Sequence, residues 1–226
     1  MTDKNYTSIT LVLDRSGSME KIKNDTVGAL TNFIREQKKF DYDNDLKTDI
    51  TFIEFDDEYK IICRGENLKD FSLPEFRPRG WTALFDAVGR AIVDTGSRLD
   101  GMPSNRRPSK VLFVILTDGE ENSSKEYKRH QIADMIKHQR EKYSWEFMYL
   151  GVGVDAFKTA QTINIPTWTT MNIGANSLGL ASASSSLSAV VGNYKIGATT
   201  GASFTQSDYA AQAKAGADNS KATSST

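Results

Sequence analysis

Five side chains that carry oxygen stand where the pattern of the chain changes. They are Asp14, Ser16 and Ser18 after the apolar run ITLVL, Thr82 in a later loop, and Asp118 after the run VLFVILT. If the two apolar runs are parallel strands, Asp14 and Asp118 emerge at the same sheet edge, where ligands of open α/β sheets bind. A set with only oxygen donors suits a hard cation. The pattern therefore predicts a site for Mg²⁺, with Ca²⁺ or Mn²⁺ as alternatives.

Simpler explanations exist for single members of this set. Ser18 could cap a helix, and Asp118 could be an ordinary turn residue. Gly17 allows a sharp backbone turn between the two serines. The whole set, in this order along the chain, favours a metal site over a series of unrelated polar turns.

Catalytic alternatives find little support in the sequence. No G-x-S-x-G motif surrounds Ser16 or Ser18, which argues against a serine nucleophile. A phosphatase of the haloacid dehalogenase type needs a second carboxylate two residues after Asp14, and that position is Ser16. The two histidines, His130 and His138, lie on one charged segment and are interpreted as solvated. We therefore expect no enzymatic activity.

The composition excludes several other classes. The formal net charge of the 226 residues is −1, so no global field attracts nucleic acid or an anionic membrane. The single cysteine, Cys63, cannot form an internal disulfide. The N-terminus lacks an apolar signal core, and no apolar stretch approaches the roughly 20 residues of a membrane span. These features predict a cytoplasmic protein that does not contact a membrane.

Strand and helix patterns alternate along most of the chain. Strands are expected at 9–14, in a hairpin over 49–65, and at 110–122, 145–154 and 167–171. Helices are expected at about 20–38, 82–99, 127–142, 155–163 and 176–193. Alternating strands and helices predict an α/β fold, with a doubly wound, mostly parallel six-stranded sheet, helices on both faces and one antiparallel edge strand from the hairpin.

The composition changes near residue 196. Residues 196–226 are rich in Ala, Ser, Thr and Gly, with few large apolar side chains. Such a segment buries too little surface to offset its ordering entropy, so the sequence predicts a domain over residues 1–195 and a disordered tail over 196–226. Phe204 and Tyr209 are the residues that would hold the tail if it packs on the domain.

At the five oxygen-bearing residues, the sequence resembles the von Willebrand factor type A (VWA) domain. Asp14-x-Ser16-x-Ser18, Thr82 in a later loop and Thr117-Asp118-Gly119 match the metal-ion-dependent adhesion site (MIDAS) of that family in type and order. The strand and helix alternation matches over about residues 6–193. The chain looks most like the stand-alone intracellular bacterial or phage members.

The resemblance implies a Rossmann-like VWA fold, a bound Mg²⁺ and a protein partner whose Asp or Glu side chain reaches the metal. In the family pattern, Ser16, Ser18 and Thr82 touch the metal, and Asp14 and Asp118 act partly through water and hydrogen bonds. Neutral hydroxyl ligands leave the charge of the cation attractive to an incoming carboxylate.

Four residues around the five are candidates for partner contacts. Arg79 and Trp81 flank Thr82, and side chains of these two types are enriched in interface hot spots. Glu120 and Glu121 directly follow Thr117-Asp118-Gly119, which departs from the family pattern. These two glutamates could raise the affinity for the metal or weaken the attraction for an acidic partner. Some intracellular members of this fold occur in ribonucleoprotein particles, so RNA binding is an alternative function, although the neutral net charge argues against it. The sequence does not define the oligomeric state.

Overall fold

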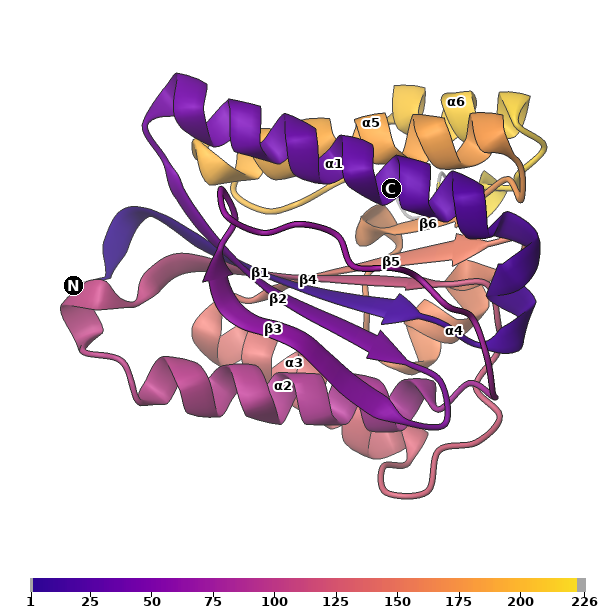
Figure 1. Ribbon diagram of the computed structural model, residues 1–226, viewed down its shortest axis with the longest axis horizontal. Coiled ribbons are helices and arrows are strands. Elements are labelled where there is room, and N and C mark those ends of the chain that lie inside the picture. The colour runs from indigo at the N-terminus through magenta and orange to yellow at the C-terminus, as the bar shows by residue number, and fades with distance from the viewer. Residues whose placement is uncertain (1, 223–226) are drawn as a thin grey trace.

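The computed structural model describes residues 2–222 and is built on one six-stranded sheet (Figure 1). The strands are β1 (Asp3–Asp14), β2 (Lys47–Phe55), β3 (Tyr59–Asn67), β4 (Pro108–Thr117), β5 (Glu146–Val152) and β6 (Thr170–Ile173). Their order across the sheet is β3-β2-β1-β4-β5-β6. All neighbours are parallel except β3, which pairs antiparallel with β2 at one edge. The predicted fold class is confirmed.

Helices cover both faces of the sheet. In Figure 1, α1 (Lys23–Asn44), α5 (Ser177–Lys195) and α6 (Gln206–Lys214) lie above the sheet, and α2 (Leu84–Asp100), α3 (Arg129–Tyr143) and α4 (Ala156–Thr162) lie below it. Alternate residues of each strand face opposite layers. Leu11 and Leu13 of β1 pack with the first helix layer, whereas Val12 packs with the second. This two-sided burial explains why β1 and β4 are nearly continuous apolar runs.

The chain reverses its direction of winding between β1 and β4. From β1 the sheet grows outward to β2 and β3, and from β4 it grows the other way to β5 and β6. The carboxyl ends of β1 and β4 therefore form the topological switch point, where the flanking loops diverge and leave space for a ligand. Asp14 is the last residue of β1, and Asp118 directly follows β4.

Most predicted elements are present, with shifted boundaries. The acidic turn of the predicted hairpin lies between β2 and β3, at residues 56–58. The first helix begins as a 3-10 helix over Gly17–Ile22 and then continues as α1 to Asn44, six residues beyond its predicted end. The last predicted strand is split into a 3-10 helix over Thr167–Thr169 and the short β6.

The expectation of a disordered tail is wrong for the part of residues 196–222 that forms α6. This nine-residue helix packs against α5 and β6. The side chains of Phe204 and Tyr209 are buried and join the core of the first helix layer. Two aromatic anchors and a capping box at Thr205 order a segment whose average composition predicts disorder. Residues 223–226 of the predicted tail lie outside the described residues.

Among residues 2–222, no helix combines the length and the apolar character that crossing a membrane requires.

Candidate metal site

Asp14 is the buried centre of the site, with an exposed fraction of 0%. Its Oδ1 accepts a hydrogen bond of 2.7 Å from the backbone N–H of Ser16. Its Oδ2 accepts a hydrogen bond from the hydroxyl of Thr117, the last residue of β4. The carboxylate is thus held from the turn after β1 and from the end of β4, which fixes its orientation.

The two serines connect Asp14 to Asp118. Ser16 is the N-cap of the first 3-10 helix and Ser18 is its second residue, and their Oγ atoms are 3.1 Å apart. The Oγ of Ser18 donates a hydrogen bond of 2.7 Å to Oδ1 of Asp118, 100 residues further along the chain. Ser16 is buried, Ser18 is exposed and Asp118 is half-buried, so the group opens to solvent at Ser18.

Thr82 enters the site from the segment before α2. Its backbone N–H donates to Oδ1 of Asn122 at 2.9 Å, and its carbonyl accepts from the backbone N–H of Asn122 at 3.0 Å. A Cβ placed on Gly119 would lie 3.2 Å from Oγ1 of Thr82 and 3.8 Å from Oδ2 of Asp14. Both oxygens therefore border the same small space, which the missing side chain of Gly119 leaves open.

The arrangement fits a hard divalent cation. Two carboxylates and three hydroxyls converge from three loops, and all are oxygen donors. Within the described part of the chain, no group of three or more His, Cys, Asp and Glu side chains could hold a metal. The five residues contribute only two carboxylates, so any metal here would depend on the hydroxyls of Ser16, Ser18 and Thr82.

The two carboxylates carry an electrostatic cost. Burial raises the pKa of Asp14 to about 6, against the lowering effect of its hydrogen bonds from Thr117 and Ser16, and the nearby charge of Asp118 raises it further. Burial also raises the pKa of Asp118, although the hydrogen bond from Ser18 and the charge of Lys21 oppose the shift. A bound cation would lower both values, because it favours the ionised forms.

Arg79 and Trp81 have different environments beside the site. The Nε of Arg79 lies 3.0 Å from Oδ2 of the buried Asp56, and the guanidinium also pairs with Glu58. Arg15 pairs with the same Oδ2 of Asp56 at 3.1 Å, and its carbonyl accepts the backbone N–H of Arg79 at 2.6 Å. Arg79 thus holds the loop over residues 68–83 against the turn between β2 and β3. The side chain of Trp81 contacts solvent, with an exposed fraction of 68%.

The two glutamates after Asp118 also differ. Glu120 is exposed and pairs with Lys158 of α4 at 3.2 Å. Glu121 accepts hydrogen bonds from the backbone N–H groups of Ser123, Ser124 and Phe85, at 2.7–2.9 Å. It therefore orders the loop after β4 and accepts a hydrogen bond from a backbone N–H in the first turn of α2.

Sequence reasoning missed three residues that support the site. Thr117, Asn122 and Arg15 each hold a predicted residue or its loop. Thr117 stood within the Thr117-Asp118-Gly119 motif, so its position was visible although its hydrogen bond to Asp14 was not. Nothing in the pattern distinguishes Asn122 or Arg15 from other polar loop residues.

No protein-family model and no curated protein sequence matches the chain. Several solved structures are similar to it. Proximal thread matrix protein 1 from the mussel byssus is 17% identical with a TM-score of 0.59, over 84% of this chain and 46% of that one. A von Willebrand factor type A protein from Catenulispora acidiphila is 15% identical with a TM-score of 0.56, over 82% and 42%. The PilB minor pilin from Streptococcus sanguinis is 12% identical with a TM-score of 0.57, over 85% and 62%.

These likenesses concern the fold. The chain spans less than half the length of the mussel and Catenulispora proteins. Another structure of the mussel protein, with a TM-score of 0.51 and 18% identity over 74% of this chain and 41% of that one, has a zinc-occupied MIDAS motif. From its strand order, its two helix layers and these neighbours, the chain has the von Willebrand factor type A fold.

Proposed function

We propose that this chain is a metal-dependent protein-interaction module. The observation that best supports the proposal is the convergence of five oxygen-bearing side chains at the switch point, with Ser18 hydrogen-bonded to Asp118 and with Thr82 and Asp14 facing the space beside Gly119. The metal in the MIDAS motif of the mussel neighbour supports divalent metal binding on this fold. The hard oxygen donors favour Mg²⁺ over softer ions.

The hydroxyls and the carboxylates have separate roles in this proposal. Ser18 donates its hydrogen bond to Asp118, so its Oγ is the acceptor in the contact with Ser16 and keeps one lone pair for a cation. Ser16 and Thr82 supply two further neutral oxygens. Asp14 and Asp118 hold the hydroxyls in place and add negative charge nearby, which matches the family pattern named above.

The neutral donors explain why such a site would bind a partner. A metal ion here supplies a positive charge that three hydroxyls neutralise poorly. A carboxylate of a partner protein would then complete the coordination and balance that charge. A site with four or five carboxylates would satisfy the ion without a partner.

Trp81 is the partner contact that its environment favours most among the four candidates. Its indole is exposed beside Thr82, whereas Arg79 and Glu121 are engaged within the chain and Glu120 pairs with Lys158. Aromatic anchors beside a polar contact are typical of interface hot spots. We expect Trp81→Ala to weaken the partner and leave metal binding unchanged.

We propose that this chain binds a partner and does not catalyse a reaction. We also propose that it acts in the cytoplasm. Both histidines are exposed on α3, whereas the five site residues lie at the end of β1 and on the loops after β1, after β4 and before α2. Assays of generic phosphatase and esterase substrates with Mg²⁺ test the absence of catalysis. Fractionation of the source cells tests the compartment.

The function is tested with a displayed library of random peptides. Peptides are selected on the immobilised protein in Mg²⁺ and eluted with EDTA. We expect the eluted peptides to share an Asp or Glu and to bind neither Ser18→Ala nor the parent in EDTA. The control, Ser72→Ala, changes an exposed serine of the 68–83 loop and should bind them as the parent does. Peptides that bind equally well in EDTA would contradict the proposal.

A further inference from the structure

The outward edge of β6 is covered by the end of the chain. β6 is the last strand of the sheet, so one side of its backbone has no neighbouring strand. Unpaired N–H and C=O groups on such an edge are a template for pairing with another chain. In this protein residues 202–221, which we call the C-terminal cover, lie along that edge.

A single side chain replaces a strand at the centre of the edge. The backbone N–H of Asn172 donates to Oδ1 of Asn219 at 2.9 Å, and Nδ2 of Asn219 donates to the carbonyl of Asn172 at 3.1 Å. Two opposed bonds of this kind are the ones that a hydrogen-bonded residue of an antiparallel strand would make. The buried carboxamide of Asn219 thus imitates one residue of a seventh strand.

The rest of the edge is satisfied from the same cover. The hydroxyl of Tyr209 lies 3.2 Å from the carbonyls of both Thr167 and Thr170. The backbone N–H of Phe204 donates to the carbonyl of Trp168 at 2.9 Å. Three residues of the cover therefore bond to the carbonyl of Trp168 in the preceding 3-10 helix and to those of Thr170 and Asn172 in β6.

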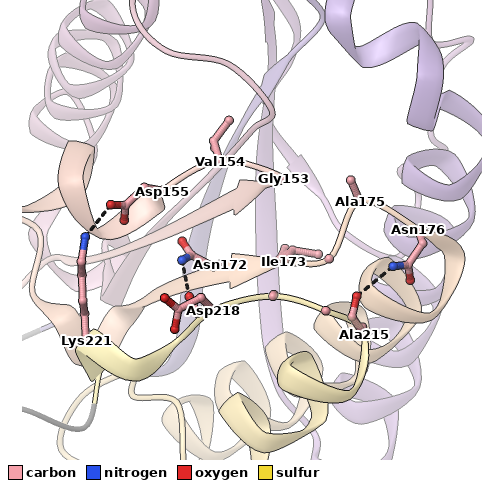
Figure 2. Close-up of a pocket in the computed structure, with 13 residues that line it drawn as sticks. Gly153, Val154, Asp155, Asn172, Ile173, Ala175, Asn176, Ala215, Asp218 and Lys221 are labelled. Atoms are coloured by element: carbon pink, nitrogen blue, oxygen red, sulfur yellow. Dashed lines mark hydrogen bonds and ion pairs between the residues drawn. The ribbon is translucent and has the colours of Figure 1, made fainter.

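Further contacts fasten the cover to the loop between β6 and α5. Gln212 is fully buried, accepts from the backbone N–H of Gly174 at 3.2 Å and donates to the carbonyl of Gly179 at 2.9 Å. Figure 2 shows Asn176 bonded to the carbonyl of Ala215. The two atoms are 2.9 Å apart, and a hollow of about 520 Å³ lies between this stretch and the ends of β5 and β6. The cover approaches the end of β6 closely at Ala215, where a Cβ added to Gly174 would lie 2.3 Å from the carbonyl oxygen, and the hollow lies beside this contact.

The cover has the features of a segment that opens by itself. α6 has nine residues, too few to be stable alone in water. Gly197 and Gly216, with φ values of +72° and +84°, flank it. Its large buried apolar side chains are Phe204 and Tyr209. Few buried apolar contacts are typical of units that open well below the free energy of global unfolding.

We propose that the C-terminal cover opens reversibly and exposes the β6 edge. In the open state, β6 pairs antiparallel with β6 of a second copy of this chain. The open edge exposes the carbonyl of Thr170 and both the N–H and the carbonyl of Asn172, together with the apolar surface under Phe204 and Tyr209. The N–H of Thr170 stays bonded to the carbonyl of Thr167. An identical edge offers the complementary groups, and two-fold pairing closes the assembly as a dimer. This inference concerns an edge away from the five metal-site residues and does not depend on the proposed metal binding.

The first test measures amide hydrogen exchange by NMR on the full chain without metal. The N–H of Asn172 should exchange at least about 100-fold faster than that of Val114 in central β4, because it is released by local opening. Equal rates for the two amides would show that the cover opens only when the whole domain unfolds, and would overturn the proposal.

The second test uses the double variant Tyr209→Phe/Asn219→Ala. It removes the side-chain hydrogen bonds of Tyr209 and Asn219 to the edge, leaves the backbone bond from Phe204 to Trp168, and keeps the ring of residue 209 against Phe204. Asn193→Ala, at an exposed asparagine of α5, is the control. Sedimentation should show a concentration-dependent dimer for the double variant only, with the Asn172 amide exposed in dilute samples and protected in concentrated ones. A double variant that stays monomeric, or that dimerises without protecting Asn172, would overturn the pairing of β6 edges.

Discussion

At the scale of single residues, Asp14 shows what the sequence could and could not predict. Its type and its place after an apolar run predicted a metal-site carboxylate at a sheet edge, and the structure places it there beside Asp118, Ser16 and Ser18. The bond from Thr117 was not predictable, because it depends on the register of β1 against β4. The internal pairing of Arg79 was missed for a similar reason, since its partners lie on the turn between β2 and β3.

Asp14→Ala should remove the response to Mg²⁺. The variant loses a negative charge and the group that orients Ser16, so millimolar Mg²⁺ should leave its thermal midpoint unchanged. In EDTA at neutral pH it should melt no lower than the parent, because the parent then holds an ionised carboxylate that burial disfavours. Thermal denaturation with Mg²⁺ and with EDTA measures both effects. A variant that still gains stability from Mg²⁺ would show that Asp14 does not belong to the metal site.

The raised pKa of Asp14 also predicts how the stability of the metal-free protein depends on pH. The folded value, about 6, lies above the ordinary value of 3.8, so the folded state holds its proton more tightly than the unfolded state. This contribution to stability is present below about pH 4 and is lost as the pH rises through 6. Urea unfolding in EDTA should therefore show a parent that weakens over this range relative to Asp14→Asn. A constant difference between the two proteins would contradict the shift.

At the scale of elements, the loops bring the site together. The alternation of strands and helices predicted both central strands and the helices that follow them. The sequence did not reveal how the 68–83 loop is fixed against the turn after β1. That connection includes the backbone bonds from Gly17 to Gly80, at 3.2 Å, and from Arg79 to Arg15, at 2.6 Å. The carboxylate of Asp56, shared by Arg15 and Arg79, adds to it.

Gly80→Ala should disturb this connection. Gly80 has a φ of +70°, and a Cβ there would lie 2.1 Å from Oδ1 of Asp57. We expect the free energy of unfolding to fall by at least about 1 kcal/mol from backbone strain alone. The Mg²⁺ response should also weaken, because Thr82 is two residues away.

The matched control for Gly80→Ala is Gly28→Ala. Gly28 is an exposed position of α1, and an added Cβ there meets nothing within 4 Å. Here alanine should raise stability by about 1 kcal/mol through its higher helix propensity. Urea unfolding of the two variants measures the contrast. Equal effects of the two changes would show that the 68–83 loop adapts without strain.

At the scale of the whole molecule, the sequence predicted one domain but misjudged its end. Average composition describes residues 196–222 as a segment without a core of its own. The structure orders them because Phe204 and Tyr209 enter a core formed by other elements, and because β6 has a bare edge to be covered. Neither fact can be read from the segment itself, since both belong to its neighbours in space.

Phe204→Ala and Phe33→Ala should separate the cover from the rest of the domain. Both rings are nearly fully buried, with exposed fractions of 5% and 1%. Phe33→Ala, in α1, should cost about 3–5 kcal/mol, the usual range for a core phenylalanine. Phe204→Ala should cost clearly less in global unfolding, because its loss cannot exceed the free energy that holds the cover closed. Equal costs in denaturant titrations would mean that the cover is an inseparable part of the domain.

The central claim is that the five oxygen-bearing side chains form a divalent-metal site, and a Mg²⁺ titration of the thermal midpoint tests it most directly. The parent starts in EDTA and receives increasing free Mg²⁺ at constant ionic strength, beside Ser18→Ala and the control Ser72→Ala. If Mg²⁺ binds the folded state, the midpoints of the parent and of Ser72→Ala rise with the logarithm of the free Mg²⁺ concentration once it exceeds the dissociation constant, and Ser18→Ala responds less or not at all. A parent midpoint that stays constant across the titration would contradict the metal site.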